Sequence, residues 1–124
     1  MRIKEKIANF EDLYVWQKAH KMALLIYKIT KDFPVEEKYG LTSQMRRAAV
    51  SIAANIAEGF KKRSRRDKMN FYNISQGSLS ELEYYLILTE DLGYYKNLTE
   101  LENLAKELGR MLNGLIASAE TLNT

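Results

Sequence analysis

Residues 44–59 decide the fold, and they read Gln44-Met-Arg-Arg-Ala-Ala-Val-Ser-Ile-Ala-Ala-Asn-Ile-Ala-Glu-Gly59. Small side chains dominate the stretch, which lets neighbouring helices approach it closely. Polar residues recur along it at steps of three or four, which places them in one stripe on a helix of 3.6 residues per turn. They are Gln44, Arg47, Ser51, Asn55 and Glu58. We therefore expect a largely buried helix whose polar stripe has partners on a neighbouring helix.

Outward from this stretch, apolar spacing predicts three more helices and no sustained strand alternation. The first is expected over about 13–33, ended by Pro34. The central helix is expected to be capped by Thr42 or a near neighbour and to run to Gly59 or Phe60. A third helix is expected from a Ser64 cap to about residue 92, where Gly93 stops it. A capping box of Asn97 and Glu100 predicts the start of the fourth.

Short connections between four helices predict an all-α fold, an antiparallel up-down-up-down four-helix bundle. The chain of 124 residues is expected to form one domain over 1–124, with 1–11 as an N-terminal arm. The first helix carries two apolar stripes, one with Leu13, Trp16, His20, Ala23, Tyr27 and Thr30, the other with Met22, Leu25, Ile26, Ile29 and Phe33. A monomeric bundle needs one stripe, so the second suggests a surface that another copy covers.

Composition excludes several classes of function. Cysteine is absent, so disulfides, thiolate metal sites and cysteine nucleophiles are absent with it. The charged N-terminus lacks the apolar core of a signal peptide, and no apolar run approaches the roughly 18 residues that a membrane span requires. We expect a cytoplasmic protein without membrane contact.

The polar stripe requires partners on the third helix. A hairpin turning at 61–64 places Ala48 opposite Gly77 and brings Arg47 within reach of Glu81. The expected structural polar network is Gln44, Arg47, Ser51, Asn55, Glu58, Ser78 and Glu81. It is read either as a buried network that fixes helix register or as a ligand or catalytic pocket. The first reading is favoured because no nucleophile–base pair accompanies these residues.

Charge is concentrated at the turn between the second and third helices. Residues 61–68 hold six basic side chains and one acidic, whereas 69–93 hold four acids and no Lys or Arg. The basic cluster consists of Lys61, Lys62, Arg63, Arg65, Arg66 and Lys68. It shares one end of the expected bundle with Arg2, Lys4 and Lys6, while acids gather at the other. Such a cluster indicates contact with nucleic acid or another polyanion, or a turn that only maintains solubility. Aromatic residues that could stack on bases there are Tyr14, Phe60, Phe71 and Tyr72.

The residues of enzymes and metal sites are missing from the sequence. His20 is the single histidine, and Gln17 stands three positions before it, where a di-iron bundle has glutamate. His20 is expected to be a core or interface residue. There is no glycine-rich phosphate loop. We expect no catalytic residue, metal ligand or cofactor, and a protein that is not an enzyme.

The chain from Phe10 to about Ala117 resembles the four-helix-bundle proteins first noted as products of intervening sequences in bacterial 23S rRNA genes. The resemblance rests on Asn55-Ile-Ala-Glu-Gly59 after Arg47-Ala48, with Phe33-Pro34, Gly77-Ser78 and Glu81-Leu82 in support. Gln76 departs from the expected alanine. The resemblance implies a bundle that assembles as a ring-shaped homopentamer. Relatives include the accessory protein of diversity-generating retroelements, which engages nucleic acid and a reverse transcriptase.

Two functions remain open at this point. The first is weak, largely shape-blind binding of structured RNA or DNA through the basic cluster. The alternative is a protein–protein scaffold or accessory subunit that holds a nucleic-acid enzyme and makes no direct contact with nucleic acid. A third class is an enzyme with a pocket at the polar stripe. If Glu81 serves such a pocket, Glu81→Gln should leave folding intact. If Glu81 belongs to a buried ion pair, the same change should lower folding stability by about 3–5 kcal/mol.

Overall fold

The computed structural model describes residues 7–122 as four α-helices and two short 3-10 helices, and this range contains no strand. The elements in chain order are η1 (Phe10–Asp12), α1 (Tyr14–Thr30), η2 (Val35–Glu37), α2 (Leu41–Lys61), α3 (Arg65–Leu92) and α4 (Thr99–Glu120). Arg2, Lys4 and Lys6, expected in the basic end, lie outside the described residues. The all-α four-helix bundle is confirmed.

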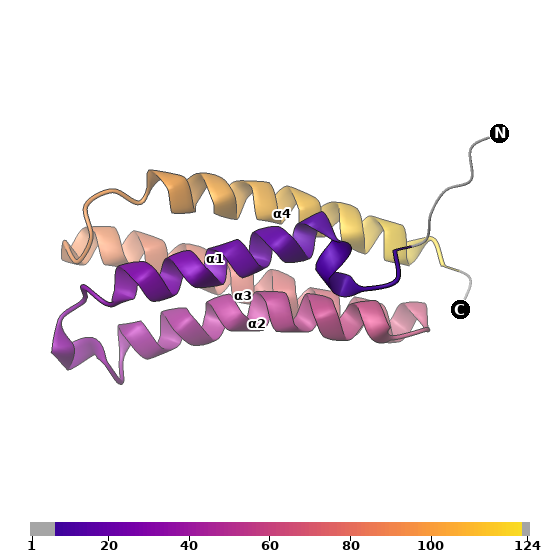
Figure 1. Ribbon diagram of the computed structural model, residues 1–124, viewed down its shortest axis with the longest axis horizontal. Coiled ribbons are helices and arrows are strands. Elements are labelled where there is room, and N and C mark those ends of the chain that lie inside the picture. Colours follow the sequence, from indigo (N-terminus) through magenta and orange to yellow (C-terminus); the bar gives the residue numbers. More distant parts are fainter. Residues whose placement is uncertain (1–6, 123–124) are drawn as a thin grey trace.

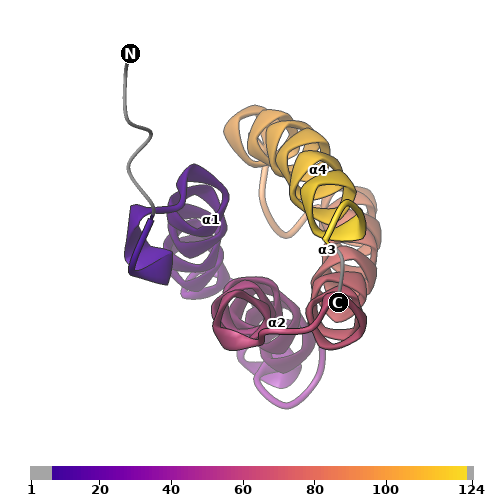
Figure 2. The same cartoon turned by 90° about the vertical axis from the view of Figure 1, so that its right-hand side faces the viewer.

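The helices run up, down, up and down (Figure 1). The α1–α2 and α3–α4 connections share one end, and the α2–α3 turn lies at the other end, where α1 begins and α4 ends. The end-on view in Figure 2 shows the helices arranged in sequence order around the bundle axis, and α1 and α3 each pack against both α2 and α4. This topology follows from the short connections, which leave consecutive helices antiparallel and adjacent.

The core is formed by one apolar face of each helix. On α1 this face includes Met22, Ile26 and Ile29, which belong to only one of its two apolar stripes. The other stripe is only partly covered: Thr30 is buried, and Trp16 and Ala23 are half-buried against the core, whereas Tyr27 is exposed. α1 therefore has apolar surface that the single chain does not cover.

Helix boundaries follow local chemistry in most places. Ser64 Oγ accepts the N–H of Asp67 at 3.1 Å, and Gly93 ends α3 in the left-handed region at φ 73°, both as expected. α1 ends at Thr30 rather than at 33, because Pro34 holds Phe33 out of helical geometry, and Phe33 then packs in the core beside Tyr94.

Two expected caps are wrong. Thr42 lies inside α2, which starts at Leu41, and the first N–H of that helix donates instead to Glu37 Oε1 at 3.0 Å. Asn97 Oδ1 accepts the N–H of Thr99 at 3.2 Å, but α4 begins at Thr99 and its N-cap, Leu98, makes no side-chain cap bond. The capping box is thus not formed as expected.

The close approach of α2 and α3 occurs at Gly59 and not at Gly77. A Cβ on Gly59 would lie 2.5 Å from Cε1 of the buried Tyr72, whereas nothing lies within 4 Å of a Cβ on Gly77, which is exposed. The pairing of Ala48 with Gly77 was therefore wrong. The observed pairing sets Ser78 against Ser51 instead of Arg47, so the facing positions are displaced by about one helical turn.

Candidate nucleic-acid interface

The basic cluster lies on the α2–α3 turn, at the end of the bundle where α1 begins and α4 ends (Figure 1). Lys61, Arg63, Arg65 and Arg66 are exposed, and Lys62 and Lys68 are half-buried. The turn is fixed by the Ser64 cap of α3. The sequence expectation that all six cations share one end is confirmed.

The individual cations differ in how firmly the protein holds them. Lys68 Nζ donates to the carbonyl oxygens of Gly59 at 3.1 Å and Phe60 at 2.9 Å, which lie in the last turn of α2. Burial lowers the pKa of Lys68 from its ordinary value. Arg65 Nη1 donates to the Glu120 carbonyl at 3.4 Å and so joins the turn to the end of α4. Lys68 therefore contributes to helix capping, while Lys61 and Arg66 project without that constraint.

The aromatic side chains expected to stack on bases are not equally available. Lys62 Nζ lies 5.2 Å from the centroid of Phe71, and Lys68 Nζ lies 5.5 Å from that of Phe60. Tyr72 is only 2% exposed, and burial raises its pKa to about 12. Tyr14 is 75% exposed. Of the four, Tyr14 alone presents most of its ring to solvent, so Tyr72 is excluded as a stacking platform.

The polar stripe is only partly internal. Asn55 Nδ2 donates to the Ser51 carbonyl at 2.8 Å and to Ser51 Oγ at 3.0 Å, and Ser78 Oγ donates to Ser51 Oγ at 2.8 Å. These three half-buried members of the expected network link α2 to α3, although Ser78 was expected opposite Arg47 and instead contacts Ser51. A further link, which sequence reasoning missed, is the donation of the buried Ser75 Oγ to the Ile52 carbonyl at 2.8 Å.

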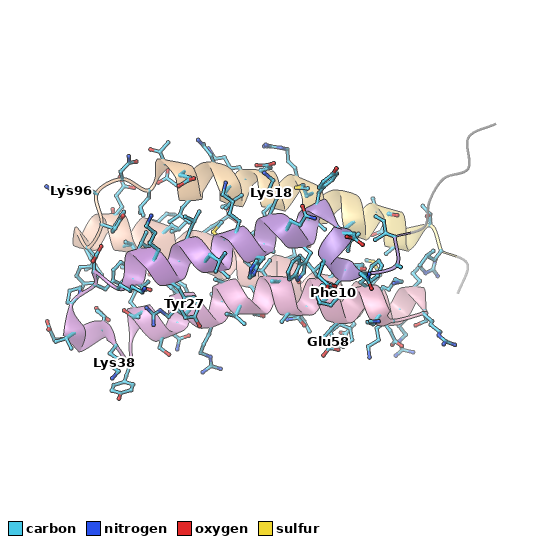
Figure 3. All side chains as sticks on the ribbon, in the orientation of Figure 1. Phe10, Lys18, Tyr27, Lys38, Glu58 and Lys96 are labelled. Atoms are coloured by element: carbon cyan, nitrogen blue, oxygen red, sulfur yellow. The ribbon has the colours of Figure 1, made fainter. Side chains whose placement is uncertain are left out.

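The other members of the predicted network were placed wrongly. Gln44, Arg47, Glu58 and Glu81 are exposed, and no ion pair joins Arg47 to Glu81 in the described range. The displaced register explains this, because Ser78 faces Ser51 instead of Arg47. Figure 3 shows Glu58 projecting outward from α2. The single described ion pair joins Lys18 and Glu107 at 3.3 Å.

His20 was expected in the core or an interface, and it is exposed in the single chain. Its ring stacks on Trp16 with centroids 5.0 Å apart and an interplanar angle of 7°. Trp16 in turn packs edge-on against Phe10 with ring centroids 5.2 Å apart, and this contact holds η1 against α1. Within residues 7–122, no three His, Asp or Glu side chains gather to hold a metal ion, and no helix is apolar over a membrane-spanning length.

The opposite end of the bundle is not purely acidic. The acids expected there are present at the α1–α2 and α3–α4 connections, yet Lys38 and Lys96 lie at this end as well (Figure 3). Glu37 is the best-fixed of the acids: Oε1 accepts the Leu41 N–H at 3.0 Å and Oε2 accepts the Tyr94 hydroxyl at 2.8 Å. These two hydrogen bonds, in that order of importance, lower the pKa of Glu37. The four-residue step to Leu41 could have signalled the cap, but nothing in the sequence signals Tyr94.

Comparison with known proteins identifies the relatives of this chain. A family model described as 23S rRNA-intervening sequence protein matches residues 11–114. A solved structure is also similar: a protein with unknown function from the S23 ribosomal protein family of Bacteroides thetaiotaomicron VPI-5482. It shares 29% sequence identity with a TM-score of 0.75, over 83% of this chain and 95% of that one. No functionally curated protein matches.

Proposed function

Because this chain belongs to the 23S rRNA-intervening sequence protein family, whose function is unknown, we propose from its own surface that it binds structured RNA or DNA through the basic cluster. The supporting observation is the gathering of six cations within eight residues on one turn, with four of them exposed. Helix N-terminal N–H groups and arginine forks are suitable donors to phosphate. No base-reading element accompanies them, so the binding is proposed to be non-specific and non-enzymatic, in the cytoplasm.

A salt titration with matched variants tests this function. Affinity for a structured RNA should fall steeply between about 50 and about 200 mM salt, as for roughly six phosphate contacts. Replacing both Lys61 and Arg66 with Gln should weaken binding and reduce the salt slope by about 0.9 per lost contact. The control replaces Lys106 and Arg110 of α4, also exposed, with Gln and removes the same charge.

The outcome distinguishes the proposal from its rival. Binding that is flat with salt, undetectable, or equally weakened by the control contradicts nucleic-acid binding through the cluster. A protein–protein scaffold for a nucleic-acid enzyme would keep its partner when Arg63, Arg65 and Arg66 are reversed to Glu, and an RNA binder would lose its RNA.

We also propose that the chain assembles into a ring, with a pentamer as the expected size. Support comes from apolar side chains left at the surface of two helices: Leu24 of α1 is 59% exposed, and Tyr84 and Ile87 of α3 are 57% and 59% exposed. Tyr84 and Ile87, three residues apart, share one face of α3, and exposed apolar surface of this kind marks association sites. In a cyclic ring every basic cluster faces the same rim, so the cationic surfaces add. Light scattering should give about five times the 14.4 kDa of one chain; a monomer would contradict the ring.

A further inference from the structure

A pocket of about 590 Å³ lies on the outer face of α2 at the α1–α2 end of the bundle. Its lining includes three cationic side chains, Lys38, Arg46 and Arg47, and two tyrosines, Tyr27 and Tyr39. The remaining lining residues, all on α2, are Thr42, Ser43, Val50 and Ser51. No carboxylate is among the described residues that line it. Figure 3 places Tyr27 and Lys38 at this end, remote from the basic cluster of the α2–α3 turn.

Arg46 is held in place before any ligand arrives. Its Nε donates to Oγ1 of the buried Thr30 at 2.9 Å, and its Nη2 donates to the Tyr27 carbonyl at 3.4 Å. The guanidinium carbon lies 4.6 Å from the centroid of the Tyr27 ring. A side chain fixed in this way loses little conformational freedom when it receives an anion. Arg46 therefore provides a preorganised positive charge in the lining of the pocket.

The other two cations are available to a ligand. Arg47 is exposed and makes no hydrogen bond or ion pair with the described residues. Lys38 is exposed, with its Nζ 5.4 Å from the centroid of Tyr39. The carboxylate next to it in sequence, Glu37, is occupied by the Leu41 N–H and the Tyr94 hydroxyl. Glu37 keeps its negative charge, but among residues 7–122 it forms no ion pair with Lys38.

We propose that this pocket binds the phosphate groups of a nucleotide, with the base stacked on Tyr39. Arg forks and a lysine ammonium are the usual donors to phosphate oxygens. The Tyr39 side chain is 87% exposed, which leaves a ring free for a base. The volume lies within the range of small-ligand sites, about 300–1,000 Å³. The nucleotide can be free or part of a single-stranded nucleic acid. The proposal does not rest on the basic cluster, which is at the other end.

Calorimetric titration with ADP tests the site. The titration is run at about 50 mM salt, because a low ionic strength limits the screening of charge interactions. Arg47→Gln should weaken ADP binding by about tenfold, the usual effect of losing one charge-assisted hydrogen bond. Tyr39→Ala should weaken ADP binding and leave inorganic pyrophosphate binding unchanged, because pyrophosphate has no base. Arg110→Gln, which removes an exposed arginine of α4 outside the pocket, should have no effect.

A short single-stranded oligonucleotide distinguishes the two sources of the nucleotide. If ADP does not bind but the oligonucleotide does, and Arg47→Gln weakens oligonucleotide binding, the proposal is supported and the ligand of the pocket is a single-stranded nucleic acid. Oligonucleotide binding that depends only on Lys61 and Arg66 overturns the pocket while leaving the proposed function intact. The proposal also fails if neither probe responds to Arg47→Gln, or if that variant only dissociates the oligomer, since the pocket would then be an interface between copies.

Discussion

The Tyr94 hydroxyl donates a hydrogen bond of 2.8 Å to Glu37, whose other carboxylate oxygen accepts the first N–H of α2. One carboxylate therefore joins the α1–α2 connection, the start of α2 and the chain after α3. The hydrogen bond from Tyr94 helps to lower the pKa of Glu37, and it raises the pKa of Tyr94 itself. Both shifts stabilise the pair in which Glu37 is ionised and Tyr94 is neutral.

The first prediction is a pH dependence of folding stability. A carboxylate whose pKa is depressed in the folded state adds stability above its unfolded pKa of about 4.3, and this stability is lost as pH falls through the folded value. Tyr94→Phe should raise the pKa of Glu37 and lower stability at neutral pH. The deficit should shrink in acid. Urea unfolding across pH and a carboxyl NMR titration of Glu37 measure this, and an unchanged Glu37 titration would contradict the hydrogen bond.

The second prediction contrasts two glycines. Gly59→Ala places a methyl group 2.5 Å and 2.8 Å from ring carbons of Tyr72 and 3.2 Å from Cβ of Phe71. Tyr72 is buried and cannot yield freely, so we expect a loss of about 1–3 kcal/mol from overpacking. Gly77→Ala meets nothing within 4 Å and should gain about 0.5–1 kcal/mol of helix propensity. Thermal and urea unfolding of both variants measure the difference. Similar effects at both sites would contradict the close α2–α3 contact.

The positions of the helices could be predicted from the sequence because strong local signals mark them. Pro34, the Ser64 cap and Gly93 each act within a few residues, and the apolar spacing identifies the inward faces. The basic cluster could also be located, since the order of helices alone brings its turn to one end.

The pairing between helices could not be predicted to the same accuracy. The register between α2 and α3 depends on where α2 ends and on how residues 62–64 cross over. An error of one helical turn in this register places Arg47 opposite Ser78, where the structure has Ser51. The Tyr94–Glu37 contact and the lining of the Tyr27–Lys38–Arg46 pocket depend on tertiary structure, which no local pattern records.

The third prediction concerns the polar stripe. Ser51→Ala and Ser78→Ala each remove the hydroxyl contact between α2 and α3, and each should cost about 1 kcal/mol. The double variant should cost less than the two together, because they share one hydrogen bond. Chemical denaturation of the four proteins provides the cycle, and full additivity would rule out the contact.

The exposed part of the stripe supplies the comparison. Glu81→Gln should change stability by no more than about 0.5 kcal/mol in the single chain, as at other exposed positions. This reverses the expectation for a buried ion pair with Arg47. A large cost that disappears on dilution would instead show that Glu81 is covered by another copy.

The fourth prediction separates two lysines of the basic cluster. Lys68→Gln removes an ammonium that caps the last turn of α2 through the carbonyls of Gly59 and Phe60, so we expect a loss of about 0.5–1.5 kcal/mol. Lys61→Gln, at an exposed position, should be neutral to stability while weakening RNA binding. Thermal unfolding together with a binding titration tests both. Equal stability for the two variants would contradict the capping role of Lys68.

The topology in Figure 1 has a practical consequence for handling this protein. α1 starts and α4 ends beside the α2–α3 turn. An affinity tag or fluorophore fused before α1 or after α4 would therefore crowd the basic cluster, whose contacts are to be measured. A histidine tag would also add its own charge. A reporter inserted at Lys96, in the α3–α4 connection at the opposite end of the bundle, would leave the basic cluster accessible.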